Sequence, residues 1–171
     1  MTAGEGWLRT DRLLLCVPQP GDLADHHAIH ADPATNVHNP AGPQTDPAAN
    51  EHQLAAWSWH WARFGFGYWT VRLAETGEVI GFGGVRPAMG DEKGLNLAYR
   101  FRPTAWGHGY AQELARAALE LARDMAPGEP VVALIVPGNA PSIKVAERLG
   151  LQLEGSVQRE LGEYLRYTVV P

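Results

Sequence analysis

A glycine-rich turn, Trp106-Gly107-His108-Gly109-Tyr110-Ala111, stands directly before a strongly amphipathic segment. Alanine and leucine recur in that segment three and four residues apart, which predicts a helix with one buried face. The first amides of a helix have no intrahelical acceptor, and the helix dipole adds partial positive charge beside them. The amides of residues 107–111 can therefore bind a pyrophosphate, with the glycines keeping Cβ atoms out of its way.

Two other phosphate motifs do not fit this turn. A dinucleotide-binding fingerprint needs a third glycine further along and an acidic residue at the end of the next strand, and neither Ala111-Gln112 nor Val131–Val136 supplies them. A Walker loop needs glycine followed by lysine and then serine or threonine, which is absent here. A plain strand-to-helix turn without any ligand is the remaining alternative.

A second helix start follows the apolar segment Val131–Val136, which itself predicts a fully buried strand. Asn139 is a favourable N-cap, Pro141 suits a first helical turn, and Gly150 is a typical C-terminal stop. These residues predict a short helix between positions 139 and 150.

Hydrophobic periodicity places the remaining elements around these two helix starts. Strands are expected at Leu8–Val17, Gly67–Ala74, Glu78–Val85, Leu95–Arg102, Leu151–Val157 and Tyr164–Val170, and helices from about Asp22 to Asp32 and from Ala48 to Phe64. The stretch Ala34–Asn50, rich in proline, asparagine and glycine, reads as a surface loop. This order of elements predicts a mixed α/β protein with one central sheet.

Composition excludes several classes of protein. A chain of 171 residues that is 45% apolar is sufficient for one core, so we expect a single domain over residues 1–171. The net charge of −5 argues against nucleic acid as a partner, and no apolar run approaches the ~20 residues of a membrane span. Cys16 is the sole cysteine, which rules out an intrachain disulfide and a thiolate zinc site and is consistent with the cytoplasm.

The two helix starts together resemble a known family. A Trp-Gly-x-Gly-Tyr-Ala start at 106–111, followed about thirty residues later by Asn-x-x-Ser-x-x-Val-Ala-Glu-Arg-Leu-Gly-Leu at 139–151, resembles the GNAT superfamily of acetyltransferases, in particular its ribosomal-protein (Rim-type) branch. Residues 8–15, Asp22 and residues 78–84 are similar to that branch as well. The resemblance implies an α/β (α+β) single-domain fold, with a central mixed, mostly antiparallel sheet of about seven strands, splayed in the middle and flanked by about four helices.

The resemblance also implies acetyl-CoA as cofactor, with the pantetheine arm between the strand ending at Phe101 and Arg102 and the strand Val131–Val136. The implied cofactor-binding residues are Phe101, Arg102, Trp106, Gly107, His108, Gly109, Tyr110, Ala111, Asn139 and Ser142, of which Asn139 and Ser142 would also be catalytic. The implied reaction is direct acetyl transfer, in a ternary complex, to a primary amine, either a protein N-terminal α-amine or a small molecule. The protein would act as a monomer or homodimer. The alternative is a catalytically weak acyl-CoA-binding sensor or interaction domain.

The chemistry of this transfer needs several groups. The attacking amine must be neutral, the oxyanion needs an amide donor such as that of Phe101 or Arg102, and Ser142 can protonate the departing thiolate. Relatives often carry a carboxylate where this sequence has Asn96, so the general base is unassigned. The candidate bases are Asp91, Glu92, His38 and a water molecule.

Aromatic residues and Asn96 are the candidates for contact with the acceptor. Trp57 and Trp61 belong to the apolar stripe of the helix 48–64, whereas Trp59 and Trp69 do not, so Trp59, Trp69 and Asn96 are the expected substrate-binding residues. Histidines at positions 26, 27 and 30 have ligand spacing on one helix face, but no third ligand is evident, so no metal is expected.

Overall fold

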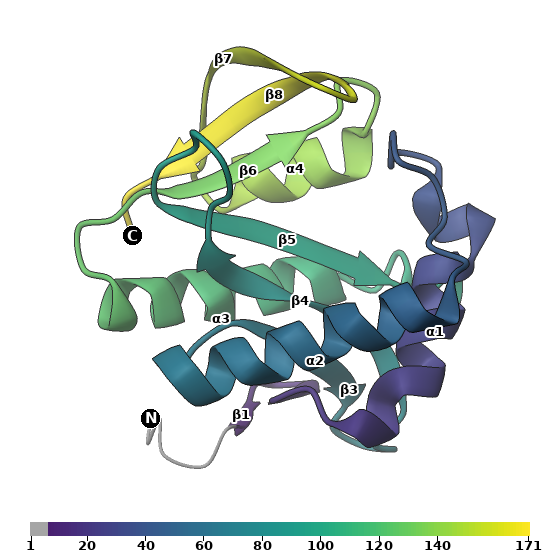
Figure 1. Ribbon diagram of the computed structural model, residues 1–171. Helices are drawn as coiled ribbons and strands as arrows, with labels where there is room; N and C mark the ends of the chain where they lie inside the picture. Colours follow the sequence, from purple (N-terminus) through teal and green to yellow (C-terminus); the bar gives the residue numbers. More distant parts are fainter. Residues whose placement is uncertain (1–6) are drawn as a thin grey trace.

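One sheet of eight strands organises the computed structural model, which describes residues 7–171 (Figure 1). The strands are β1 (Trp7–Arg9), β2 (Leu13–Cys16), β3 (Tyr68–Leu73), β4 (Val79–Pro87), β5 (Leu95–Phe101), β6 (Val131–Ile135), β7 (Gln152–Arg159) and β8 (Gly162–Val169), in the order β1-β2-β3-β4-β5-β6-β8-β7. The helices are α1 (Leu23–Ala31), α2 (Pro47–Phe64), α3 (Tyr110–Met125) and α4 (Ala140–Arg148). Every strand pair is antiparallel except β5 with β6. The predicted mixed, mostly antiparallel sheet with four helices is confirmed.

The eighth strand comes from the start of the described chain, where one strand over Leu8–Val17 was expected. The structure divides this segment into β1 and β2, which pair with each other as a hairpin. Thr10 makes the turn, since its amide donates to the Leu13 carbonyl at 2.9 Å and its hydroxyl accepts from the Leu13 amide at 3.1 Å. A hydroxyl that closes a turn is a weak signal within an apolar pattern, so the break was missed.

The helix α2 begins one residue before the predicted Ala48 and ends at Phe64 as predicted, because both its ends carry local signals. Asp46 accepts a hydrogen bond from the Ala48 amide at 3.0 Å, and Gly65 ends the helix in the left-handed conformation, with φ of 74°. The spacing of Leu54, Trp57, Trp61 and Phe64 predicts one buried stripe, but Phe64 is 45% exposed. At the last position of the helix its ring packs against the ring of His60, 4.7 Å away, on the helix surface.

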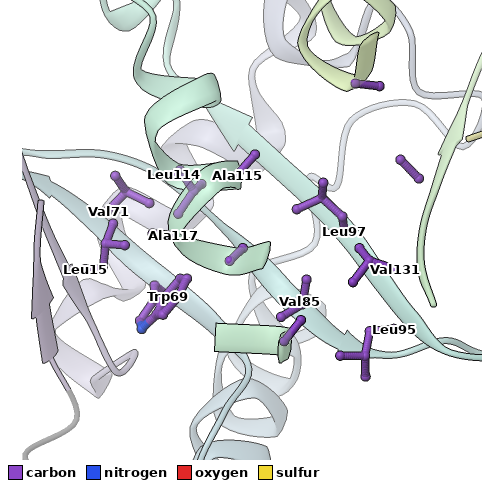
Figure 2. Close-up of a cluster of buried hydrophobic side chains, with 14 of the residues drawn as sticks. Leu15, Trp69, Val71, Val85, Leu95, Leu97, Leu114, Ala115, Ala117 and Val131 are labelled. Carbon is purple, nitrogen blue, oxygen red and sulfur yellow. The ribbon is translucent and has the colours of Figure 1, made fainter. Parts of the chain in front are cut away.

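Two apolar clusters cover the two faces of the sheet. The larger cluster lies beneath α3 and α4, where Leu114, Ala115 and Ala117 of α3 pack onto strand residues such as Val71 and Leu97 (Figure 2). Alanine on this face lets α3 lie close to the sheet, as the sequence pattern predicted. The smaller cluster lies beneath α1 and α2 and comprises Ile29, Leu54, Trp57, Tyr68, Val79 and Phe82.

Strands β5 and β6 diverge soon after they begin (Figure 1). They pair only through Leu95 with Val131 and Asn96 with Val132, although β5 continues to Phe101 and β6 to Ile135. This is the splay that was expected in the middle of the sheet. Throughout residues 7–171 no helix is both long and apolar enough to cross a bilayer.

Candidate functional site

The open end of the splay lies between two helix starts. After β5 the chain passes through a short 3-10 turn, Pro103–Ala105, and the two glycines before α3 begins. Gly107 and Gly109 have φ values of 78° and 80°, a left-handed conformation that residues with a side chain rarely adopt. A Cβ built on Gly107 would meet no atom within 4 Å, so the turn has open space where a ligand could approach.

The first turn of α3 has no side-chain cap. Its N-cap is Gly109, which has no side chain to satisfy the first amides, and the first helical hydrogen bond runs from the Glu113 amide to the Gly109 carbonyl at 3.1 Å. The rings of His108 and Tyr110 stack with their centroids 5.5 Å apart at the side of the turn. Uncapped amides, a helix dipole and an open glycine together fit the predicted pyrophosphate.

Arg12, from the β1–β2 hairpin, holds this turn from the side. Its Nη1 donates to the His108 carbonyl at 2.8 Å, its Nε donates to Glu113 Oε2 at 2.8 Å, and its guanidinium lies 4.8 Å from the centre of the Tyr110 ring. Thr10 also donates to Glu113, at 2.5 Å. Burial acts to raise the pKa of Glu113, but these hydrogen bonds from Thr10 and Arg12 outweigh it and hold the pKa below its usual value.

Sequence analysis did not find Arg12 or Glu113 as parts of the site. About one hundred positions separate them, and neither stands in a motif whose spacing requires the other. The single signal was a glutamate in the first turn of a helix, which is favourable there with or without a partner.

The second helix start has the predicted cap. Asn139 Oδ1 accepts from the Ser142 amide at 3.3 Å, and Pro141 lies in the first turn of α4. The Asn139 carboxamide oxygen is therefore engaged by α4 itself. Ser142 is half-buried in the first turn of α4.

Tyr99 connects β5 to α4 across the splay. Burial raises the pKa of Tyr99, while a side-chain hydrogen bond with Ser142 works in the opposite direction. The phenol therefore stays protonated at neutral pH, beside the serine hydroxyl. The alternating pattern of residues 95–102 predicts that Tyr99 shares one face of the strand with Leu97 and Phe101, but it indicates no function for Tyr99.

The backbone of β5 offers unpaired groups to the splay. The Arg102 amide donates to the Ile80 carbonyl at 2.9 Å, and residues of an antiparallel pair alternate in direction, so Arg100 and Ala98 also bond to β4. Leu97, Tyr99 and Phe101 then point their amides and carbonyls toward β6. The Arg102 amide was expected as a possible oxyanion donor. It is already bonded to the Ile80 carbonyl and is therefore not available for that role.

Side chains at the end of β5 are also engaged. Phe101 is buried, and its carbonyl accepts from the indole nitrogen of Trp106 at 2.9 Å. The guanidinium of Arg102 pairs with Asp25 at 2.7 Å and with Glu78 at 3.2 Å. The Trp106 indole thus fastens the turn before α3 to the end of β5, and the Arg102 guanidinium holds that end of β5 to Asp25 and Glu78.

The expected acceptor residues do not come together. Asn96 faces the α1 and α2 side of the sheet and donates to the Tyr68 hydroxyl at 2.6 Å. Trp69 points to the opposite face, is 2% exposed and packs near Trp61 in the larger cluster, so it is a core residue (Figure 2). Trp59 is 63% exposed on α2. The side of a strand residue follows its register, which the aromatic character of Trp69 does not reveal.

The expected bases also differ in their surroundings. Glu92 pairs with Arg166 at 2.8 Å and with Arg159 at 3.0 Å, and these contacts, the Arg166 hydrogen bond above all, keep the pKa of Glu92 low. A carboxylate held in this way is a poor acceptor for a proton from an ammonium group. Asp91 and His38 are exposed on loops.

Two histidines of α1 are buried under α2. The rings of His26 and His30 stack 4.0 Å apart and lie against Trp57 and Phe82. Burial lowers the pKa of His26 to about 4 and that of His30 to about 3, so both rings are neutral at pH 7. Within the described part of the chain, no group of three or more histidine, cysteine or acidic residues is placed to hold a metal ion.

Comparison with known proteins gives a family match over most of the chain. A family model described as "Acetyltransferase (GNAT) domain" matches residues 12–152. The uncharacterized protein YkkB of Bacillus subtilis (strain 168) is 34% identical over 97 residues, which cover 56% of this chain and 56% of YkkB. The match therefore extends over about half the length of that relative.

Solved structures share the fold. The acetyltransferase from Agrobacterium tumefaciens str. C58 has a TM-score of 0.82 and 29% identity, with 95% of this chain and 93% of that chain covered. The ribosomal-protein-S5-alanine acetyltransferase from Vibrio fischeri has a TM-score of 0.74 and 14% identity over 96% of each chain, a likeness that shows the fold alone.

The buried histidine pair predicts a pH dependence of the free energy of unfolding. The ordinary pKa of these imidazoles is 6.5, and in the folded protein the values are about 4 and about 3. The unfolded chain binds more protons between these limits, so the stabilising contribution is complete above pH 6.5 and is lost as the pH falls toward 3. Each ring is expected to lower the free energy of unfolding by about 1.4 kcal/mol for each unit by which the pH falls within this interval.

Urea unfolding at a series of pH values, from just above the ordinary histidine pKa downward, measures this slope. His30→Leu should flatten it, whereas His52→Gln, on the exposed surface of α2, should leave it unchanged. An equal slope in the wild-type protein and His30→Leu would show that His30 does not remain neutral in the folded state.

Proposed function

Because this chain belongs to the GNAT acetyltransferase family, whose members use acetyl-CoA, we propose that it transfers an acetyl group from acetyl-CoA directly to a primary amine. The observation that carries this proposal is the splay between β5 and β6, with the uncapped start of α3 at its open end. An unpaired strand edge and an anion site in that order suit an extended arm attached to a pyrophosphate.

The cofactor-binding residues are proposed on the same geometry. Acetyl-CoA supplies the acetyl group as a thioester. The backbone groups of Tyr99 and the amide of Phe101, which point toward the splay, would pair with the amide groups of the pantetheine arm, as a further strand would. Residues 107–111 would bind the pyrophosphate, with Trp106 and Arg102 supporting the turn, and Asn139 and Ser142 would lie beside the arm at the start of α4.

Three groups of this chain would assist the reaction. The amide of Tyr99 or Phe101 would donate to the developing oxyanion. The hydroxyl of Ser142 would give its proton to the departing sulfur, and the protonated phenol of Tyr99 would replace that proton. The amine nitrogen would lose its proton to a base outside the ion pairs described, such as a water molecule.

Direct transfer is supported by the state of the single cysteine. Cys16 lies on β2, three strands from β5 in the order of the sheet. Burial raises the pKa of the Cys16 thiol above its ordinary value, which disfavours the thiolate needed for an acyl-enzyme.

The acceptor and the branch of the family belong to the same proposal. The helix-start motifs support the ribosomal-protein (Rim-type) branch, and the acceptor would be a protein N-terminal α-amine or a small-molecule amine. The sheet runs from residue 7 to residue 169, in support of one domain over residues 1–171. The second candidate, a weak acyl-CoA-binding sensor, is favoured by one observation, that Asn96 and not a carboxylate stands on β5.

An amine panel distinguishes the two candidates. Acetyl-CoA binding is measured by calorimetry and thiol release by a colorimetric assay, with and without each amine. An enzyme releases thiol in proportion to the amine that it acetylates, whereas a sensor binds acetyl-CoA and releases none.

Gly107→Ala tests the pyrophosphate site against a matched glycine. Gly107 and Gly128 have φ values of 78° and 83°, and a Cβ at either meets nothing within 4 Å, so both alanine variants carry the same backbone cost, about 1–2 kcal/mol. The affinity for acetyl-CoA should fall about tenfold or more in Gly107→Ala and stay unchanged in Gly128→Ala. If calorimetry gave equal dissociation constants for the two variants, the turn would not be the pyrophosphate site.

Arg12→Ala tests whether the hairpin positions the turn. Loss of the contacts with His108 and Glu113 should raise the dissociation constant of acetyl-CoA about three- to tenfold and leave kcat unchanged. Arg116→Ala is the control, since it removes the same charge from the exposed side of α3. A similar loss in both variants would point to general electrostatics instead of positioning.

Ser142→Ala tests the proton donor. We expect kcat to fall about 10- to 100-fold, because general acid assistance to the departing sulfur is lost, with little change in acetyl-CoA affinity. Tyr99→Phe should also lower kcat, and the double variant should be no slower than Ser142→Ala, because the two hydroxyls act in series. Ser156→Ala, on the exposed strand β7, is the control. Normal turnover in Ser142→Ala would remove Ser142 from the mechanism.

A further inference from the structure

Arg100 is a part-buried arginine without a carboxylate partner. It lies near the end of β5, on the face toward α1, where alternate residues Asn96, Ala98 and Arg100 share one side of the strand. Its side chain donates to Asn36 Oδ1, a neutral acceptor that also receives a hydrogen bond from Asn39 at 2.8 Å. A guanidinium has five N–H donors, so most of those of Arg100 are left without a strong acceptor.

The surroundings of Arg100 supply no negative charge. Burial alone lowers its pKa, with no compensating carboxylate. The neighbouring imidazoles of His26 and His30 are neutral, and the charge of Arg100 contributes to keeping them so. Across residues 7–171, the arginines that form ion pairs are Arg12, Arg72, Arg102, Arg123, Arg159 and Arg166. A desolvated charge without a counter-ion is costly, so a bound anion would be stabilising here.

Arg86, on the neighbouring strand β4, has the same character. Its guanidinium lies 5.0 Å from the centre of the Tyr68 ring, and its Nε is buried without a hydrogen-bond partner. Arg86 stands opposite Asn96 in the register, on the face that Arg100 shares. Between the two arginines this face carries Gly84 opposite Ala98, and the ring of Tyr68 lies beside them.

Two carboxylates on the segments around β5 are already neutralised. Glu92 is bound by Arg166 and Arg159, while Asp25 is bound by Arg102. A polyamine or another polycation would be repelled by the unpaired guanidinium groups of Arg86 and Arg100.

We propose that the acceptor is a small primary amine that also carries a carboxylate, as an amino acid does, and that Arg100 binds this carboxylate. The inference rests on the proposed acetyl transfer. A carboxylate bound at Arg100 would leave the amine near Tyr99, the next residue of β5, whose free amide faces the splay. Arg100 would thus select the acceptor by its charge.

The test compares amino acids with their own carboxamides. Alanine, phenylalanine and β-alanine are assayed against the matching amides, with kcat/KM expressed per neutral amine, and spermidine is added as a polycation. The wild-type protein should prefer the acids about tenfold or more, because a site built to pair with a charged group rejects the analogue that lacks it.

Variants then assign the preference to one residue. Arg100→Gln should reduce the acid-to-amide ratio to near one, with amide turnover and acetyl-CoA affinity unchanged, whereas Arg86→Gln should retain most of it. If the preference were lost in Arg86→Gln and kept in Arg100→Gln, the assignment to Arg100 would be overturned.

The remaining outcomes separate this inference from the proposed function. Equal rates with acids and amides in the wild-type protein, or faster acetylation of spermidine or of a C-terminally amidated peptide, would overturn the inference alone. Thiol release with no amine at all, despite acetyl-CoA binding, would overturn both. The wild-type comparison holds even if Arg100→Gln fails to fold.

Discussion

The parallel pairing of β5 with β6 ends after two residues, and the arrangement of the site depends on this constraint. Backbone amides and carbonyls need partners, so a strand edge released within a sheet is open to an extended ligand. The other edge of β5 is held tightly by β4, where a Cβ on Gly81 or Gly83 would come within 2.6 Å of a β5 carbonyl oxygen. β5 is therefore fixed on one side and free on the other.

The same divergence gives the two helix starts different tasks. The start of α3 has a glycine cap and open space, whereas the start of α4 is capped by its own Asn139. One helix end keeps its positive field available for an anion, and the other presents a serine hydroxyl beside Tyr99. Arg12 adds rigidity to the first, because one guanidinium binds both the turn and Glu113.

Charge is distributed unevenly, although the chain as a whole carries −5. Most arginines near the sheet are neutralised by carboxylates from other elements. Arg166 of β8, for example, pairs with Glu92 in the loop between β4 and β5 and with Glu154 on β7. Arg86 and Arg100 differ, since their partners are an aromatic ring, a sulfur and an amide oxygen. Net charge thus says little about the surface that an acceptor meets.

Local chemistry in the sequence was enough for the element types, both helix starts and the alternation of β5. Glycines with positive φ, an asparagine cap and an apolar period act within a few residues, so their consequences appear in the sequence directly. The contact of Arg12 with Glu113, the inward side of Trp69 and the burial of His26 came from packing between distant segments. Register, strand divergence and burial depend on the whole sheet, and no local pattern encodes which side chains it brings together.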